Sequence, residues 1–448
     1  MYVSKSSETP KYYDPEIETM DREQLEELQL KRLKWQVKRC YEFSEFYRER
    51  FDNIGLDPED IKSLDDITKI PPVTKEELRQ EQIAHPPFGR YVVAPQKDWR
   101  ELHPSTGTTG VPVNTIWTEH DIENITQWTV RTMWNCGVRP GDIVQNGFSY
   151  GLWVAGMSCH YAAKAMGCFV LPIGASMAER QVDYLISPGS TVLLSTPSFA
   201  LYIAERMSQR GIRPKDIPLK IGMHGGEAGA EVPPTRHKIE TRLGIDAYDY
   251  FGLAEIGPTC ASECEEKAGI HWVEDHLLVE IINPETKKRC NPGEVGVLVL
   301  THLTKEATPM LRYWTNDLAR LTTEKCGCGR THARCEGGIL GRADDMIIYK
   351  GENFYPAQVE KVIRSFDELG DEFRIRITTD EKTGIDVITV VAEYKTKEID
   401  NEEFKNKVKR AFREELQVTP GLELVEFGTL ERTMFKAKRV EDQRAKAS

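Results

Sequence analysis

The segment STVLLSTPSFALYIAERMSQR, residues 190–210, contains the two structural patterns that recur along this chain. It begins with a short apolar run, and after a proline it continues with apolar residues at helical spacing. A second apolar run of the same kind is GVLVLTHL, residues 296–303. Short apolar runs alternate with helical patterns up to about residue 340. This alternation predicts layers of α-helices and β-strands, that is, an α/β fold.

The segments on either side of this region have their own patterns. Residues 21–51 carry apolar side chains at helical spacing on a charged background, which predicts one long amphipathic helix. Another helix is expected to begin after Thr74, because Glu77 three residues later completes a capping-box signature. Glycine and charged residues interrupt the apolar pattern at GRADDMIIYKGENFYP, residues 341–356, which indicates a domain boundary.

Beyond residue 356 the pattern changes to that of a small α+β domain. The predicted elements are a helix at 357–366, strands at 372–379 and 387–394, and a helix at 401–416. The predicted fold class is therefore a large, multi-layered α/β N-terminal domain, residues 1–343, with a small α+β C-terminal domain, residues 344–448.

Composition excludes several classes of partner. The chain has 448 residues, a hydrophobic fraction of 40%, a charged fraction of 29% and a formal net charge of −12. That charge disfavours nucleic acid and anionic membranes as partners. No apolar run approaches the roughly 20 residues of a membrane span, and the first residues lack the apolar core of a secretory signal. We therefore expect a cytoplasmic protein, in which the 10 cysteines are reduced and more suited to metal binding than to disulfides.

The segment STGTTGVPV, residues 105–113, combines hydroxyl side chains with glycines in one short loop. Such a loop can present several hydrogen-bond donors to an anion, which suggests a phosphate-binding loop. An ordinary polar surface loop is the alternative. The loop is not a P-loop of the nucleotide hydrolases, because no Gly-Lys-Ser/Thr follows a glycine at the required spacing, and no complete dinucleotide glycine fingerprint follows a strand.

Further motifs follow this loop in a fixed order: HGGEAGAE at 224–231, YFGLAEIGP at 250–258, LRYWTNDLARL at 311–321, the segment 341–356, and LERTMFKAKRV at 430–440. Together their order and spacing resemble the adenylate-forming acyl-CoA synthetase superfamily, over essentially the whole chain. Within it, segments 149–168, 190–205 and 302–318 are most similar to the phenylacetate-CoA ligase family.

The resemblance implies activation of a carboxylic acid in two steps. The carboxylate attacks the α-phosphorus of Mg·ATP to give an acyl-adenylate and pyrophosphate, and a thiol, usually that of coenzyme A, then displaces AMP. The residues that match ATP-binding positions of the family are Ser105, Thr106, Gly107, Thr108, Thr109, Gly110, Gly226, Glu227, Phe251, Gly252, Asp317 and Arg342.

The resemblance gives these residues separate roles. The loop at 105–110 would hold the β- and γ-phosphates, although Val113 stands after Pro112 where many relatives have a lysine. Glu255 would hold Mg²⁺ with a hard anionic oxygen. Phe251 stands where most relatives have tyrosine; its ring would stack on adenine, with Gly225, Gly226 and Glu227 along the adenine edge. Asp317 would accept hydrogen bonds from both ribose hydroxyls, with Arg342 near the same nucleotide.

The C-terminal motifs imply a moving domain. Lys436 matches the catalytic lysine that bridges the carboxylate and the α-phosphate, as Glu255 matches the catalytic metal ligand. Phe435 precedes it where relatives usually have glycine, so Lys438 is an alternative, and a solvated basic tail is another. Asp344 matches the hinge about which the C-terminal lid rotates. The residues expected to line the path of coenzyme A are Gly351, Glu352 and Asn353.

The acyl-binding pocket is the least specific assignment. Relatives build it where this chain has Phe148, Tyr150, Gly151 and Trp153. Simple core packing of these aromatic residues is the alternative. Their aromatic character favours an acid with a flat apolar body.

A separate group of cysteines and a histidine predicts a metal site. Cys264 and His271 form one pair, and Cys326 and Cys328 lie one residue apart. Three thiolates and one imidazole match a preferred tetrahedral arrangement for structural Zn²⁺, and some members of the family carry cysteines and a histidine at similar places. Cys260, Cys335 and His332 are spare candidates, and cysteines without metal are the alternative.

The sequence thus predicts an ATP-dependent, AMP-forming acid–thiol ligase that joins a small aromatic or arylacetic acid, similar to phenylacetate, to coenzyme A. Its expected cofactors are ATP, Mg²⁺, coenzyme A and a structural Zn²⁺. One alternative is a carboxylate-adenylating enzyme with an acceptor other than coenzyme A, and another is a degenerate relative that binds nucleotide or metal as a regulator. The identity of the acid and the oligomeric state are left open, although relatives are often homodimers.

Overall fold

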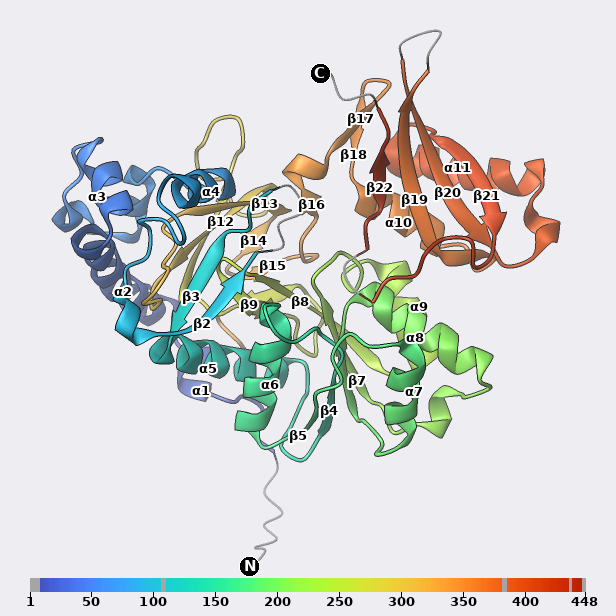
Figure 1. Ribbon diagram of the computed structural model, residues 1–448, viewed down its shortest axis with the longest axis horizontal. Coiled ribbons are helices and arrows are strands. Elements are labelled where there is room, and N and C mark those ends of the chain that lie inside the picture. The colour runs from blue at the N-terminus through green and yellow to red at the C-terminus, as the bar shows by residue number, and fades with distance from the viewer. Residues whose placement is uncertain (1–8, 106–109, 381–384, 435–436, 445–448) are drawn as a thin grey trace, which may run out of the picture.

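A computed structural model describes residues 9–105, 110–380, 385–434 and 437–444. It confirms the mixed α/β class, with a large N-terminal part and a smaller C-terminal part beside it (Figure 1). The large part contains two main sheets with their covering helices and a separate two-stranded sheet, and the chain ends in the α+β unit drawn in orange to red.

The larger sheet is the centre of the N-terminal part. In spatial order its strands are β14 (Leu321–Thr322), β15 (Arg334–Cys335), β10 (Ile270–Trp272), β9 (Gly257–Ser262), β8 (Asp246–Leu253), β7 (Ile221–Gly225), β6 (Val192–Ser195), β4 (Ile143–Asn146) and β5 (Phe169–Leu171). The strands from β8 to β5 are parallel, and the pairing becomes antiparallel from β8 to β9 and beyond.

Helices cover both faces of this sheet, and β6 shows why its sequence is continuously apolar. Val192 and Leu194 pack into the cluster under α5 (Glu119–Asn135) and α6 (Val154–Met166). Leu193, between them, packs into the opposite cluster. Because successive side chains of a strand point to opposite faces, a strand buried on both faces needs an unbroken apolar run. The helices on Leu193's side are α7 (Ala178–Ile186), α8 (Pro197–Gln209) and α9 (Pro233–Leu243).

The second sheet has the order β1 (Val73–Thr74), β13 (Tyr313–Ala319), β12 (Gly296–His302) and β11 (Leu277–Ile282), and β16 (Gly341–Arg342) also pairs with β13. The capping box is confirmed, since Thr74 Oγ1 accepts from Glu77 N at 3.2 Å and Glu77 Oε2 accepts from Thr74 N at 2.7 Å. These bonds begin α4 (Lys75–Ala84).

The single long helix expected over residues 21–51 is wrong in one respect. The segment forms two helices, α2 (Arg22–Phe43) and α3 (Glu45–Asp52). Ser44 between them has extended backbone, ends α2 and caps α3 by accepting from Tyr47 N at 3.3 Å. Serine favours a helix N-cap over a helix interior, so the apolar spacing alone missed this break.

The remaining N-terminal elements are short. They are α1 (Pro15–Glu18), the hairpin of β2 (Trp99–Pro104) and β3 (Asn114–Thr118), and the 3₁₀ turns η1 (Pro58–Asp60), η2 (Leu64–Lys69), η3 (Gln96–Asp98), η4 (Pro214–Asp216) and η5 (Ala343–Asp345).

The C-terminal unit has its own sheet and its own apolar core. The sheet order is β21 (Gly421–Glu426), β20 (Asp386–Tyr394), β19 (Leu369–Thr379) and β22 (Val440–Asp442). The other elements are the hairpin of β17 (Ile347–Tyr349) and β18 (Glu352–Phe354), α10 (Pro356–Arg364), η6 (Lys397–Ile399) and α11 (Glu402–Leu416). Its apolar cluster includes Ile347, Phe373 and Phe412. The boundary at residue 344 stays a prediction.

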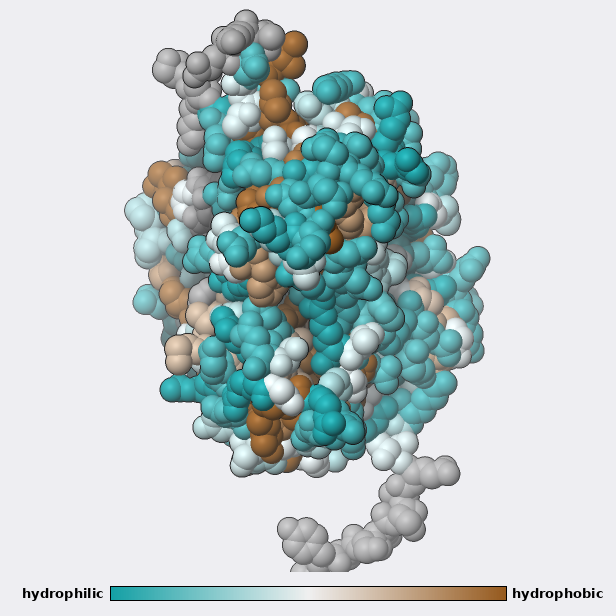
Figure 2. Space-filling model, turned by 90° about the vertical axis from the view of Figure 1, so that its right-hand side faces the viewer, coloured by the Kyte–Doolittle hydropathy of each residue, from teal (hydrophilic) through white to brown (hydrophobic). Residues whose placement is uncertain are grey.

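The outer surface is largely polar on the side of the C-terminal unit. Figure 2 shows this side as mostly hydrophilic, with hydrophobic side chains in separate spots. Among the described helices, none is long and apolar enough to cross a membrane.

Candidate functional site

Glu255 lies in the turn between β8 and β9 and is buried, with 3% of its surface exposed. Its Oε1 is 3.0 Å from Nζ of Lys75, the first residue of α4. β1 pairs in parallel with β13 and places the start of α4 beside this carboxylate. Burial and the neighbouring Glu255 raise the pKa of the Tyr313 hydroxyl, so that this residue of β13 stays protonated and can donate. The sequence alone did not connect Lys75 or Tyr313 with Glu255, because both residues lie far from Glu255 along the sequence.

The turn that carries Glu255 requires a glycine at position 252. A Cβ added to Gly252 would lie 2.0 Å from the carbonyl oxygen of Pro258, which is a backbone atom that cannot move aside alone. Phe251 beside it is partly buried and packs against Trp272, with ring centroids 5.7 Å apart at 69°. The FGLAE motif therefore has a packing role in addition to any nucleotide contact, and stacking of Phe251 on adenine stays a prediction.

Asp317 and Arg342 are directly opposite each other in the pairing of β13 with β16. Arg342 Nη1 donates to Asp317 Oδ1 at 3.1 Å, and Arg342 Nη2 donates to Asp344 Oδ2 at 2.8 Å. Burial of Arg342 opposes its charged form, but the carboxylates of Asp317, Asp344 and Asp345 outweigh burial and raise the pKa of Arg342. The structure thus joins the predicted ribose ligand, the predicted nucleotide-side arginine and the predicted hinge residue in one charged group.

The base of the predicted phosphate loop is held closed. Ser105 N donates to Val113 O at 2.8 Å, and Val113 N donates to Ser105 Oγ at 3.0 Å. Arg79 of α4 supports the far side, where its Nε donates to Val111 O at 3.1 Å close to Gly110. The tip of the loop, Thr106, Gly107, Thr108 and Thr109, lies outside the described residues, so its phosphate-binding role stays a prediction.

Glu227 follows β7 and Gly226, which has a φ of 88°. Its two carboxylate oxygens accept from two backbone amides: Oε1 from Ser198 N at 2.9 Å and Oε2 from Ala437 N at 2.6 Å. Ser198 lies in the first turn of α8, and Ala437 belongs to the C-terminal segment. The carboxylate therefore connects parts of the chain that the sequence reasoning did not join.

The predicted acyl-binding residues have mixed environments. Phe148 is buried and packs edge-on against Tyr250, with centroids 5.8 Å apart, in the core under α5 and α6. Tyr150 Oη accepts from Asn146 Nδ2 at 2.9 Å. Trp153 is partly buried, and Gly151 has a φ of 84°. Phe148 thus fits the core-packing alternative, and the pocket assignment stays a prediction.

The predicted coenzyme A residues lie at the β17–β18 hairpin. Gly351, at its turn, has a φ of 86°, and Glu352 and Asn353 are exposed in β18. Lys436 and the preceding Phe435 lie outside the described residues. Lys438, the alternative to Lys436, is exposed.

Four residues that could hold a metal ion come together at the end of the larger sheet. One ligand atom from each of Cys264, His271, Cys326 and Cys328 lies within 4.8 Å of the others, and all four residues are buried. His271 is in β10, between β9 and β15. Its Nδ1 is 3.2 Å from the carbonyl oxygen of His332, which can only accept, so the proton is on Nδ1 and Nε2 is left for a metal. The donor set fits Zn²⁺.

The spare candidates have other partners. Cys335 Sγ accepts from Trp272 Nε1 at 3.2 Å, Cys260 Sγ donates to Phe251 O at 3.5 Å, and His332 contacts the carbonyl oxygen of Ile17 at 3.0 Å.

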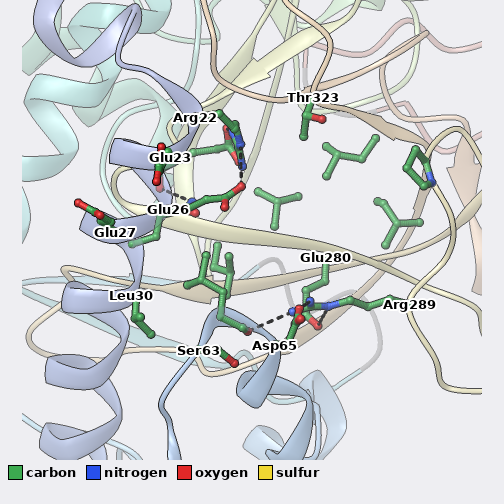
Figure 3. A pocket seen from close by; sticks show the side chains of 18 of the residues that line it. Arg22, Glu23, Glu26, Glu27, Leu30, Ser63, Asp65, Glu280, Arg289 and Thr323 are labelled. Atoms are coloured by element: carbon green, nitrogen blue, oxygen red, sulfur yellow. Dashed lines mark hydrogen bonds and ion pairs between the residues drawn. The ribbon is translucent and has the colours of Figure 1, made fainter.

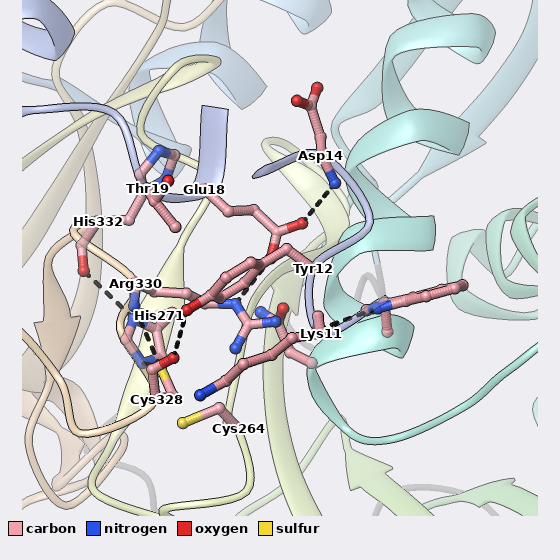
Figure 4. A network of polar contacts seen from close by, with 12 residues as sticks. Lys11, Tyr12, Asp14, Glu18, Thr19, Cys264, His271, Cys328, Arg330 and His332 are labelled. Atoms are coloured by element: carbon pink, nitrogen blue, oxygen red, sulfur yellow. Dashed lines mark hydrogen bonds and ion pairs between the residues drawn. The ribbon is translucent and has the colours of Figure 1, made fainter. Parts of the chain in front are cut away.

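The N-terminal segment lies over the four-residue cluster (Figure 4). The sequence predicted the cluster but not this covering segment. Tyr12 Oη donates to Cys328 O at 2.8 Å, and Arg330 Nε donates to the buried Glu18 at 2.8 Å. No local sequence signal connects positions 12 and 18 with position 330, because these contacts depend on how α1 lies on the sheet.

Comparison with known proteins identifies the family of this chain. The model of the AMP-binding enzyme C-terminal domain matches residues 351–444. The phenylacetate-coenzyme A ligase of Thermus thermophilus is 41% identical over 81% of this chain and 80% of the relative. That of Aromatoleum evansii is 37% identical over 96% of this chain and 97% of the relative. The chain belongs to the phenylacetate-CoA ligase family.

A solved relative shows the same architecture as this family member. It is a 2-hydroxyisobutyryl-CoA ligase, 30% identical, in the postadenylation state with its acyl-adenylate; the match covers 98% of this chain and 94% of the relative with a TM-score of 0.91. The same ligase in its thioesterification state matches with a TM-score of 0.74.

The protein also has a cavity of about 640 Å³, which lies away from the predicted site. It lies between α2, residues 62–65 and the β11 region (Figure 3). Two ion pairs bridge its walls, with Arg22 Nη2 at 2.9 Å from Glu274 Oε1 and Arg289 Nη1 at 2.5 Å from Asp65 Oδ1. None of its described lining residues is one of the predicted site residues.

The collision at Gly252 gives a test of the Glu255 turn. We expect Gly252→Ala to lower the thermal unfolding midpoint by several degrees, because the added Cβ would push the turn apart. Gly141→Ala is the control: its φ is 90°, but its Cβ would meet nothing within 4 Å. It should cost only the backbone strain of about 1–2 kcal/mol. Equal midpoints for the two variants would contradict the close approach.

Proposed function

We propose that the protein is an AMP-forming ligase that activates an aromatic or arylacetic acid, of the phenylacetate type, and transfers the acyl group to coenzyme A. The observation that carries this proposal is the group of Glu255, Asp317 and Arg342, which the sequence spreads over three motifs and the fold brings to β13 and its neighbours. The activities of the relatives favour coenzyme A over another acceptor.

The residues present support binding of Mg·ATP. Glu255 offers a buried carboxylate, which suits a hard divalent cation, and Lys75 and Tyr313 hold it in place. Magnesium would neutralise phosphate charge while the carboxylate of the acid substrate attacks the α-phosphorus. Asp317 is the acceptor for the ribose hydroxyls, and Arg342 fixes its orientation through Oδ1. Many relatives have a lysine at the position of Val113. In this chain Lys75 would supply a positive charge near the phosphates instead.

Acid specificity is tested by pyrophosphate release with benzoic, phenylacetic, indoleacetic, acetic and long-chain fatty acids, with and without coenzyme A. We expect the highest kcat/KM for an acid with a flat apolar body, and formation of its thioester only when coenzyme A is present. A maximum for acetate or a fatty acid would contradict the aromatic assignment. Pyrophosphate release without an acyl-CoA product would favour the alternative acceptor.

The catalytic lysine is tested by separating the two half-reactions. Charge stabilisation of a transition state is worth about 3 kcal/mol or more, roughly a hundredfold in rate. Lys436→Ala should therefore slow acyl-adenylate formation by at least this factor, while supplied acyl-adenylate still reacts with coenzyme A. Asp344→Pro, which stiffens the proposed hinge, should show the reverse pattern. If Lys438→Ala abolishes the first step instead, the role belongs to Lys438.

The four-residue cluster is proposed to hold one structural Zn²⁺. With four protein ligands the ion would have no open position, so it would join the segments after β9 and β14 without taking part in the chemistry. Elemental analysis of protein purified without chelator should give one zinc per chain. Cys328→Ser should lower both the zinc content and the unfolding midpoint, whereas Cys290→Ser, a thiol outside the cluster, should change neither. Full zinc content in Cys328→Ser would contradict the site.

A further inference from the structure

We propose that Glu227 and helix α8 form a dock that positions the segment carrying Lys436 for the adenylation half-reaction. The proposal rests on the function proposed above and assigns Glu227 a role different from that of an adenine ligand. It makes Glu227 a positioning residue, because its carboxylate acts on the backbone next to the catalytic lysine.

The contacts on the N-terminal side of Lys436 come from Arg432 and Met434. Arg432 Nη2 donates to Glu205 Oε2 of α8 at 3.2 Å, and the same guanidinium is held within the C-terminal unit by Glu393 Oε2 at 2.8 Å. Met434 packs on the apolar cluster under α7, α8 and α9. Before the lysine, one ion pair therefore fixes the chain to α8 and one apolar contact fixes it to the cluster under α7, α8 and α9.

The contacts on the C-terminal side come from Ala437 and Arg439. Ala437 N donates to Glu227 Oε2 at 2.6 Å. Arg439 Nη2 donates to Ser198 Oγ at 2.9 Å, while its Nη1 donates to Glu372 of the C-terminal unit at 2.8 Å. After the lysine the segment is thus attached at the N-terminus of α8, whereas before it the attachment is to Glu205 in the second half of the same helix.

The side chain of Glu227 is also held by a contact within the N-terminal part, independent of the C-terminal segment. Its Oε1 accepts from Ser198 N, a first-turn amide of α8 that has no partner within the helix. A carboxylate is favoured there because the helix N-terminus carries partial positive charge. This bond leaves Oε2 free to meet Ala437 N, so the N-terminus of α8 aims the carboxylate at the C-terminal segment.

The bond to Ala437 N acts directly on the catalytic residue. That N–H belongs to the peptide group joining Ala437 to Lys436, and a peptide group is planar. Fixing this N–H therefore restrains the chain directly beside Lys436, which is how Glu227 would influence the lysine. Two amides need two acceptor oxygens, and a glutamine at 227 would offer one oxygen and turn an NH₂ group toward the other N–H.

The dock belongs to one arrangement of the two units. This structure matches the 2-hydroxyisobutyryl-CoA ligase better in its postadenylation state, with a TM-score of 0.91, than in its thioesterification state, with 0.74. We therefore expect the dock to be used in the first half-reaction and released in the second.

The test uses Glu227→Gln in the full-length protein. Loss of a charge-assisted hydrogen bond should slow acyl-adenylate formation roughly tenfold or more in kcat. The KM for ATP should stay within about twofold, and supplied phenylacetyl-adenylate should react with coenzyme A at near the normal rate. Retention of this second step also shows that the variant is folded. Glu205→Gln, which loosens the other flank through Arg432, should act in the same direction but less strongly.

The matched control is Glu240→Gln. This glutamate also accepts from a backbone amide, Ala247 N at 3.1 Å, and from a lysine, but all its partners lie in the N-terminal part. It should leave both half-reactions unchanged. A raised KM for ATP with unchanged kcat in Glu227→Gln would make Glu227 a nucleotide ligand and overturn the dock, as would an equal loss in both half-reactions.

A measurement without substrate separates the dock from the proposed function. Hydrogen exchange of the peptide that covers residues 437–444 should be faster in Glu227→Gln than in the unmodified protein or in Glu240→Gln. Unchanged exchange would overturn the dock even if the enzyme proves to be a ligase. If no acid in the panel releases pyrophosphate but exchange still rises, the dock stands and the proposed function fails.

Discussion

The pairing of β13 with its neighbours is the constraint on which the candidate active site depends. β1 on one edge brings the start of α4, and with it Lys75, to Glu255. β16, paired with the far end of β13, sets Arg342 opposite Asp317 and leads the chain to Asp344. A slip of one residue in either pairing would turn these side chains to the other face of the sheet. The register of this one strand therefore determines whether the charged groups meet.

The patterns that the sequence predicted well are those set by local chemistry. Continuous apolar runs indicated strands such as β6, and the Thr74–Glu77 pair indicated the start of α4. Burial on two faces and capping of helix amides each depend on only a few neighbouring residues, so a local pattern is enough to predict them. The cysteine and histidine cluster was also predictable, since few residue types bind Zn²⁺ and the ligands lie close together in sequence within each of the two pairs.

The contacts that the sequence did not reveal are those between distant segments. Lys75 with Glu255, Glu227 with Ala437, and Tyr12 with Cys328 each join residues whose local patterns suggest a capped helix, a turn or a surface position. The split of the N-terminal helix at Ser44 is a different case. There the apolar spacing continued through a residue whose preference for capping ended the helix.

The contact between the N-terminal part and the C-terminal unit includes several ion pairs and hydrogen bonds beside the apolar contact of Met434, whereas each part has its own apolar core. Asp371 of the C-terminal unit is paired with Arg242 and lies 3.6 Å from Lys238, both on α9, and Glu360 accepts from Thr235 at 3.1 Å. Burial favours the uncharged form of Lys238 and lowers its pKa to about 8, although Asp371 opposes this. Charged and hydroxyl groups can exchange their partners for water when the units separate, at a much smaller cost than exposing an apolar core. An interface of this kind is compatible with the proposed rotation of the C-terminal unit, and the hydrogen bonds of α8 and α9 to that unit are the contacts that such a rotation would have to break.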